Sequence, residues 1–252
     1  MKLVIHVTSD IGNVRENNED MVLVGDEFLR DVSTSYELDF DGSEQPFLVA
    51  VADGMGGHKG GAYASEAVLF QMNQAVRDLR NDLSNTELKD YFNERIKAAH
   101  TRLLEEGSKD ADKTGMGSTF VGVLFFHGFI FLINVGDSRL YRFRDGMLAQ
   151  LSRDHSLSEM IKNPDAPKNI IVNSFGAGQK IFFDFEDISQ RILPDDKILL
   201  CSDGLSGELA DEEIESILSD APDTTKLIDA AKDKEGKDNI SAVVIDYKDM
   251  PE

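Results

Sequence analysis

The chain has 252 residues, 41% of them hydrophobic, and no linker or low-complexity tract divides it, so we expect one domain over residues 1–252. Its 47 acidic and 26 basic side chains give a formal net charge of -21, which argues against nucleic acid or an anionic membrane as a partner. The sequence favours a cytoplasmic protein for three reasons. It has a single cysteine, no apolar run approaches the ~20 residues of a membrane span, and its first residues do not have the pattern of a signal peptide. The acidity favours solubility first, and attraction of basic partners second.

The predicted elements of the N-terminal half are strands first and helices second. In order, they are strands at 1–8 and 21–25, an acidic hairpin region near 36–44, a buried strand at 47–52, a helix from about 64 to 79, and a helix that starts at a Ser84-x-x-Glu87 capping box. From Ser118 onward, Val, Phe and Ile dominate and the pattern changes to that of strands.

The C-terminal half is predicted to contain successive antiparallel strands followed by a helix pair. In order, it has strands at 119–126 and 129–135 around His127-Gly128, strands at 140–143 and 147–151 around a turn at Asp145-Gly146, an irregular region at 156–180, strands at 180–185 and 197–201, a helix capped at Asp211, a helix from about Thr224, and a strand at 240–247. Antiparallel strands with helices in separate pairs predict a layered α+β sandwich.

Two Asp-Gly pairs follow predicted strands whose residues are nearly all apolar, so neither face of these strands is expected to be exposed to solvent. Asp53-Gly54 follows FLVAVA, Asp203-Gly204 follows KILLCS, and Asp238 precedes the last strand. Bare carboxylates at the mouths of buried strands repel each other unless a cation or a proton joins them, so this pattern predicts bound hard cations. The alternative for each residue is a helix cap or a turn, as at Asp145-Gly146 and at Asp41-Gly42.

The opening loop, SDIGNVRENNED, and the segment NVGDSRLY add charged residues to this pattern. Arg15 precedes Glu19 and Asp20, and its guanidinium suits bidentate capture of a tetrahedral oxyanion; the alternative is a surface ion pair. Asp137 follows another apolar strand. The glycine cluster DGMGGHKGG could present backbone groups to a ligand, but it lacks the spacing of a P-loop.

Taken together, the ordered stretches resemble the PP2C (PPM) family of metal-dependent protein serine/threonine phosphatases, bacterial type. The matching stretches are SDIGNVRENNED, VADGMGGHKGGAYAS, GMGSTF, NVGDSRLYRFRDGMLAQLSRDHS, LCSDGLSGELADEEI and KDNISAVVIDY. The resemblance implies a four-layer αββα sandwich of two antiparallel sheets flanked by helix pairs.

The resemblance also implies the metal ligands. Asp53 would bridge two Mn2+ or Mg2+ ions, and the Gly54 carbonyl would bind one of them. Asp203 and Asp238 would complete the shell of the other ion. Oxygen ligands favour Mg2+ or Mn2+ over Zn2+, and the histidines show no close zinc-ligand spacing.

Further site residues follow from the same resemblance. Glu19 and Asp20 resemble ligands that act through water, and Arg15 matches the phosphate-binding arginine. Asp137, with Asp203, matches the position of a third metal ion. The implied reaction is attack of a metal-bridging hydroxide on phosphoserine or phosphothreonine, without a phosphoenzyme. The implied partners are phosphorylated proteins, including a serine/threonine kinase that the enzyme reverses, and the expected state is a monomer.

A thiol mechanism is an alternative that the sequence does not favour. Cys201 is followed six residues later by Gly207, where a thiol phosphatase needs an arginine, so Cys201 is interpreted as a buried hydrophobe. Two other functions remain open: a metal-binding fold that binds phosphoproteins without turnover, and a phosphatase restricted to one regulatory phosphoprotein, such as an anti-anti-sigma factor.

The sequence also departs from the family pattern. Met55 stands where eukaryotic members often carry a histidine, so a side-chain general acid is not expected there; His58 is a possible substitute, and His155 is interpreted as structural. The flap region at about 156–180 is shortened, with Lys168 and Asn173 where arginines are usual, which bears on substrate selection and third-metal binding.

Overall fold

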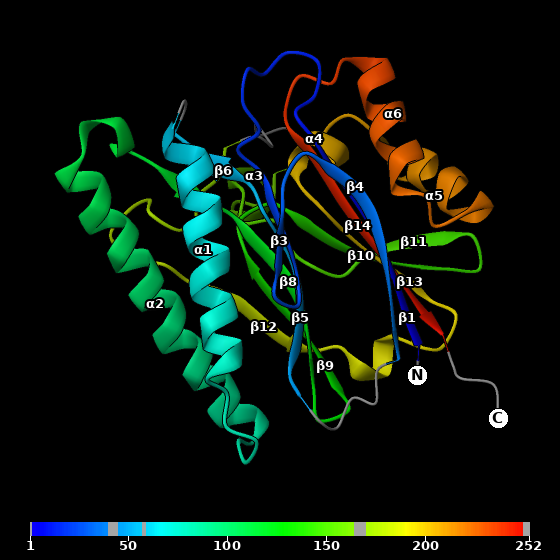
Figure 1. Ribbon diagram of the computed structural model, residues 1–252, viewed down its shortest axis with the longest axis horizontal. Helices are drawn as coiled ribbons and strands as arrows, with labels where there is room; N and C mark the ends of the chain where they lie inside the picture. The colour runs from blue at the N-terminus through cyan, green and yellow to red at the C-terminus, as the bar shows by residue number, and fades with distance from the viewer. Residues whose placement is uncertain (1, 40–44, 57–58, 164–169, 249–252) are drawn as a thin grey trace.

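The computed structural model describes residues 2–39, 45–56, 59–163 and 170–248. Two six-stranded antiparallel sheets, called here sheet A and sheet B, form the centre of the molecule, and helices lie on their outer faces (Figure 1). The four-layer αββα sandwich predicted from the sequence is confirmed.

Sheet A contains the first and the last strand of the chain. Its strands, in spatial order, are β11 (Met147–Gln150), β10 (Arg139–Arg144), β13 (Lys197–Cys201), β14 (Ile240–Lys248), β1 (Lys2–Asp10) and β4 (Val32–Asp39). Sheet B contains β12 (Asp184–Asp187), β9 (Phe129–Val135), β8 (Phe120–Phe126), β5 (Phe47–Ala52), β2 (Met21–Val24) and β3 (Glu27–Leu29).

Each sheet is covered by its own helices. In Figure 1, α1 (Lys59–Arg77) and α2 (Asn85–Lys109) lie over sheet B, and α5 (Asp211–Asp220) and α6 (Thr224–Lys234) lie on the opposite side of the molecule, over sheet A. The smaller elements are β6 (Gly54–Met55), η1 (Ala111–Lys113), β7 (Gly117–Ser118), α3 (Leu157–Met160), η2 (Ser189–Arg191) and α4 (Asp203–Ser206). Among the described residues, no helix combines the length and the apolar character needed to cross a membrane.

Three buried clusters fill the spaces between the layers, and β5 shows how the sequence produces them. Leu48, Ala50 and Ala52 pack toward α1 and α2, while Val49 and Val51 pack into the cluster between the sheets. A third cluster lies between sheet A and helices α5 and α6. The prediction that FLVAVA is a strand buried on both faces is therefore confirmed.

Several predicted boundaries differ from the structure. Residues 180–183 are not part of β12, because the backbone N–H of Phe182 donates to the Asn173 side chain rather than to a neighbouring strand. Asp211 is the first residue of α5 and not its cap; the backbone N–H of Ala210 donates to Glu213. The capping box of α2 is confirmed. Residues 40–44 of the predicted acidic hairpin region, including Asp41-Gly42, lie outside the described residues, as do His58 and Lys168.

Candidate metal centre

The predicted carboxylates come together where the two sheets end. In sheet B, β5 pairs with β2 so that Ala52 lies opposite Met21, which places Asp53 beside Asp20. In sheet A, β13 pairs with β14, so Asp203 and Asp238 emerge from one end of that sheet. The sandwich thus brings acidic residues from four separate segments to a common end of the molecule.

Burial of these carboxylates has a large electrostatic cost. Burial raises the pKa of Asp20 to about 7, and burial together with the charges of Asp20 and Asp203 raises the pKa of Asp53 well above its usual value. Burial and the nearby Asp238 raise the pKa of Asp203, which shares a hydrogen bond with Asp53. Burial, with repulsion from Asp203, raises the pKa of Asp137 to about 7. Each of these shifts favours the protonated form of the carboxyl group, so a nearby positive charge would stabilise the ionised forms.

Buried oxygen atoms without partners show what the site lacks. In the described part of the chain, the Oδ1 atoms of Asp20, Asp137 and Asp203 are buried and accept no hydrogen bond. Unsatisfied buried carboxylate oxygens cost free energy, and they are the donors that Mg2+ and Mn2+ prefer. The donor set therefore fits hard divalent cations.

The carboxylates are close, but they are not yet arranged as ligands. Within the described residues, no three His, Cys, Asp or Glu side chains surround one point closely enough to hold a metal ion. Asp53 and Asp203 share a hydrogen bond, and Asp238 pairs with Arg15, whose Nη2 lies 2.6 Å from Asp238 Oδ2. Both side chains are partly exposed, at 51% and 38%. The predicted phosphate-binding arginine is thus paired with a predicted ligand.

Glycines let the opening loop approach the end of β5. A Cβ at Gly54 would lie 2.1 Å from the Gly61 carbonyl oxygen and 2.6 Å from that of Glu19, and a Cβ at Gly61 would lie 2.5 Å from Glu19 Oε2. No Cβ fits at Gly54, so this glycine is explained by close approach of the backbone. This packing brings Glu19 next to Gly54, as the prediction of a shared site requires.

Three polar residues that the sequence analysis missed hold the site residues in place. The backbone N–H of Asp53 donates to Thr119 Oγ1 at 3.0 Å, and Ser202 Oγ donates to Asp20 Oδ2 at 2.7 Å. Asn239 Oδ1 accepts the Glu19 N–H at 2.8 Å, while its Nδ2 donates to two carbonyls of the same loop. Asn239 directly follows Asp238, and this adjacency is the only sequence signal that pointed to it.

Asp137 is fixed from the side of the flap. His155 donates its backbone N–H to the Gly136 carbonyl at 2.8 Å and accepts the Gly136 N–H on Nδ1 at 3.1 Å. Asn173 Nδ2 also contacts His155 Nδ1, at 2.8 Å, and His155 Nε2 lies 3.2 Å from Asp184 Oδ2. His155 is buried, in agreement with its structural interpretation, and it connects the turn before Asp137 to the return of the flap.

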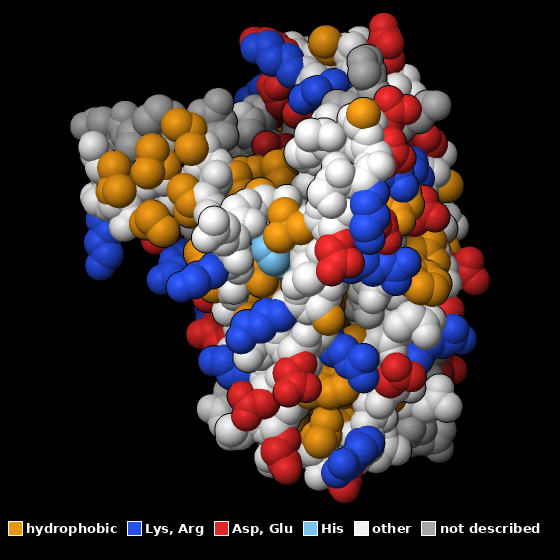
Figure 2. All heavy atoms as spheres, turned by 90° about the vertical axis from the view of Figure 1, so that its left-hand side faces the viewer, with side chains coloured by type: hydrophobic (Ala, Val, Ile, Leu, Met, Phe, Trp, Pro, Cys, Tyr) orange, Lys and Arg blue, Asp and Glu red, His pale blue; other side chains and the backbone are white. Residues whose placement is uncertain are grey.

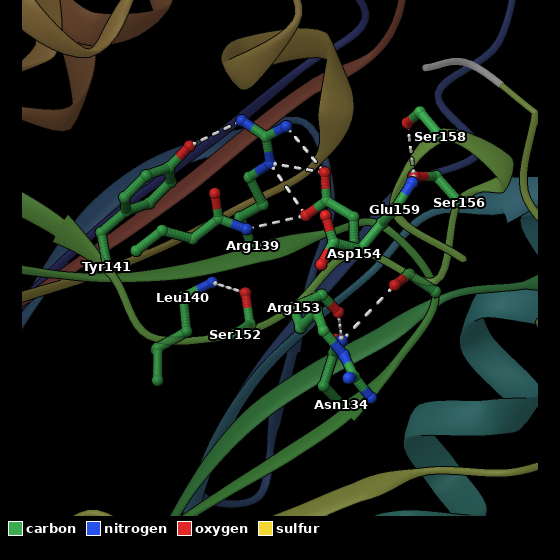
Figure 3. Close-up of polar contacts among 12 residues, drawn as sticks. Asn134, Arg139, Leu140, Tyr141, Ser152, Arg153, Asp154, Ser156, Ser158 and Glu159 are labelled. Carbon is green, nitrogen blue, oxygen red and sulfur yellow. Dashed lines mark hydrogen bonds and ion pairs between the residues drawn. The ribbon is translucent and has the colours of Figure 1, made fainter. Parts of the chain in front are cut away.

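Next to this turn, Figure 3 shows a partly buried ion pair of Arg139 with Asp154. Arg139 Nη2 lies 2.7 Å from Asp154 Oδ2, and Arg139 Nη1 donates to the Tyr141 hydroxyl at 2.9 Å. Asp154 and Tyr141 therefore hold the Arg139 guanidinium in place. A wider hollow of about 830 Å³, lined in part by Gly25, lies elsewhere and contains none of the predicted site residues.

Cys201 lies at the end of β13 with no exposed surface. Burial raises the pKa of its thiol to about 12, so no thiolate forms near neutral pH. The interpretation of Cys201 as a buried hydrophobe therefore agrees with the structure, and thiol chemistry is excluded.

Comparison with known proteins places the chain in a family. The sequence profile of the protein phosphatase 2C family matches residues 37–244. The chain belongs to this family. It is a phosphatase of the PP2C serine/threonine type, as the resemblance predicted.

Named relatives of this phosphatase span nearly all of its sequence. "Serine/threonine phosphatase stp" of Listeria monocytogenes serovar 1/2a is 28% identical over 255 residues, which cover 94% of this chain and 93% of the relative. "Serine/threonine protein phosphatase PstP" of Mycobacterium tuberculosis is 30% identical over 253 residues, covering 96% of this chain and 44% of PstP.

Solved structures give the same family. A serine/threonine phosphatase of S. agalactiae matches with a TM-score of 0.81 and 26% identity, over 98% of this chain and 100% of that one. The catalytic domain of PstP in complex with two manganese ions matches with a TM-score of 0.74 and 28% identity, over 99% of this chain and 100% of that one. Divalent metal dependence is thus supported for this phosphatase.

Proposed function

We propose that this phosphatase hydrolyses phosphoserine and phosphothreonine in proteins with two divalent cations, Mn2+ or Mg2+, and that a third can bind. The observation that carries the proposal is the set of Oδ1 atoms on Asp20, Asp137 and Asp203, which are buried and have no hydrogen-bond partner among the described residues. The names of the relatives and the manganese-bound PstP structure support the same function.

In this proposal, each acidic residue has a separate role. Asp53 is near both Asp20 and Asp203 and would bridge the two ions, and the Gly54 carbonyl would contribute one further oxygen. Asp203 and Asp238 would hold the second ion. Glu19 and Asp20 would act through water, and Asp137 with Asp203 would form the third site. Support comes from the mutual electrostatic effects of these carboxylates.

The protein's own side chains then determine how the phosphate is bound. When bound, the cations would neutralise the phosphoryl oxygens and supply an acidified water as the nucleophile. Arg15 would leave Asp238 and bind two phosphate oxygens with its guanidinium fork. The buried Cys201 offers no nucleophile, which supports direct attack by water without a phosphoenzyme. Met55 has no titratable proton to donate, so in this proposal water would supply the proton of the leaving group.

The proposed partners are phosphorylated proteins, and the proposed role is to reverse a serine/threonine kinase. The test is phosphate release from a phosphothreonine peptide by the wild type and by Asp203→Ala, each with Mn2+, Mg2+ or EDTA. We expect release that needs metal and falls on the order of 100-fold or more in Asp203→Ala, because the variant lacks a charged ligand of the second ion. Asp82→Asn, an exposed carboxylate near the start of α2, is the control.

Two results would lead to other functions. A folded, metal-loaded wild type that binds the phosphopeptide without releasing phosphate would favour a phosphoprotein-binding module. Release from one regulatory phosphoprotein only, with no activity on generic peptides, would favour the specialised phosphatase.

A further inference from the structure

A shallow groove of about 400 Å³ gathers basic residues on a protein whose net charge is -21. Lys89 comes from α2, Arg153 from the loop after β11 and Arg191 from η2, so three separate elements supply the cations. Among other residues, the apolar side chains of Leu132, Leu151, Phe183 and Phe185 and the acidic side chains of Asp184 and Glu186 line the groove. Three cations and two carboxylates therefore line this groove, against the charge of the whole molecule. Figure 2 shows Lys and Arg side chains interspersed with Asp and Glu side chains on one face of the molecule.

Arg153 is held only weakly, whereas Arg191 Nη1 lies 3.0 Å from Glu186 Oε2. In the described structure the Arg153 guanidinium donates no hydrogen bond, its one ion pair is with Asp184 at 3.5 Å, and its side chain is 64% exposed. Figure 3 shows this side chain directed away from the Arg139–Asp154 pair. Lys89 makes no ion pair with any described residue, although its charge lowers the pKa of Asp184, where the hydrogen bond from His155 is the larger cause. Such exposed contacts are worth little free energy and exchange easily for an incoming anion.

The groove borders a second hollow, and residues of both are connected to the turn before Asp137. Arg153 also lines a second hollow of about 310 Å³, whose wall includes Arg139 and Ser156. Arg139 is two residues from Asp137, and Asp184 contacts His155, which holds the turn before Asp137. A peptide whose phosphoresidue lies at the metal centre could therefore extend along the two hollows toward Arg153.

We propose that this groove is an accessory site for a second anionic group on the substrate, a phosphate or a carboxylate close in sequence to the phosphoresidue that is hydrolysed. The proposal rests on the proposed function and extends it to substrate selection. Arg153 binds the anion with its two parallel N–H donors, and Lys89 and Arg191 flank it. When the anion binds Arg153, the Asp184 side chain stays in place through its contact with His155.

The kinetic test uses a set of phosphothreonine peptides with neutral flanks into which one glutamate, or one phosphoserine, is placed at successive positions on either side. We expect one region of these positions to lower KM about tenfold, with the phosphoserine peptide stronger than the glutamate peptide because it carries more charge. Arg153→Gln should abolish this preference while kcat and turnover of a small aryl phosphate stay unchanged. Arg80→Gln, an exposed arginine beside α2, is the matched control.

The result that would overturn the proposal is metal-dependent hydrolysis with no such preference, or a preference that Arg153→Gln retains. If the glutamate lowers KM and the phosphoserine does not, the groove binds carboxylates. If the phosphoserine lowers KM and the glutamate does not, the groove binds phosphate. A binding assay separates this proposal from the proposed function: with EDTA present, a labelled peptide with both anionic groups should bind the wild type at least fivefold more tightly than Arg153→Gln. Equal binding would reject the groove even if no peptide is hydrolysed.

Discussion

At the scale of single residues, the acidic ligand candidates could be predicted and the residues that hold them could not. Asp53 and Asp203 stand out because each follows an apolar run that predicts a strand buried on both faces. Thr119 and Ser202 carry no such signal, because their partners lie 66 and 182 residues away in the sequence. Only the folded structure shows that these common hydroxyl side chains fix a carboxylate.

Thr119 provides the first residue-scale prediction. Replacing it with valine removes the oxygen that accepts the Asp53 N–H, so we expect kcat/KM to fall about 10- to 100-fold and manganese affinity to weaken. The buried N–H left without a partner should lower the free energy of unfolding by about 1–3 kcal/mol. Steady-state kinetics, manganese titration and urea unfolding measure these effects, with the exposed Thr101→Val as control. Loss of stability with unchanged kinetics would show that Thr119 does not position Asp53.

At the scale of elements, the strands and helices that have strong apolar patterns could be predicted, whereas irregular chain could not. Residues 180–183 contain Ile181, Phe182 and Phe183 and were predicted as a strand. The structure instead uses Asn173, whose side chain accepts from the Phe182 N–H and donates to the Phe182 carbonyl. The Asn173 side chain provides the hydrogen bonds that a neighbouring strand would otherwise provide, and the sequence near Phe182 contains no sign of this.

Asn173 gives the element-scale prediction. Asn173→Ala removes its contacts with Phe182 and His155, and we expect the free energy of unfolding to fall by about 1–3 kcal/mol. Because these contacts hold the return of the flap, kcat/KM for a phosphopeptide should fall about tenfold, with less than twofold change for a small aryl phosphate. Equal losses on both substrates would contradict this role. The exposed Asn81→Ala is the control.

At the scale of the whole molecule, the layered fold could be predicted from the order of strand runs and helix pairs. The overall negative charge could also be predicted from the sequence, but the gathering of basic side chains in one groove could not. The net charge of -21 predicts a surface that repels anions, yet Lys89, Arg153 and Arg191 meet in one groove. These residues are far apart in the sequence, and the tertiary fold alone brings them together.

The buried carboxylates also predict how stability depends on pH. In the metal-free protein, Asp20 and Asp137 have pKa values raised to about 7, so between about pH 4 and pH 7 the folded state holds protons that the unfolded chain has released. Raising the pH through this window should therefore lower the free energy of unfolding by several kcal/mol, because each group contributes about 1.4 kcal/mol per unit of pKa shift.

Urea unfolding in EDTA at several pH values between 4.5 and 7.5 measures this slope. Asp20→Asn should flatten it, because the amide does not titrate, and saturating Mn2+ should restore stability near neutral pH. A slope that Asp20→Asn leaves unchanged would assign the effect to the overall negative charge instead.

The central claim is that the carboxylates at the common end of the two sheets form a metal centre. The most direct measurement is a crystal structure of the protein with manganese, in which anomalous scattering locates the ions. We predict two ions joined by Asp53, with Asp203 and Asp238 on one of them and Arg15 released from Asp238. Manganese bound only on the acidic surface, with the pair of Arg15 and Asp238 intact, would contradict the account.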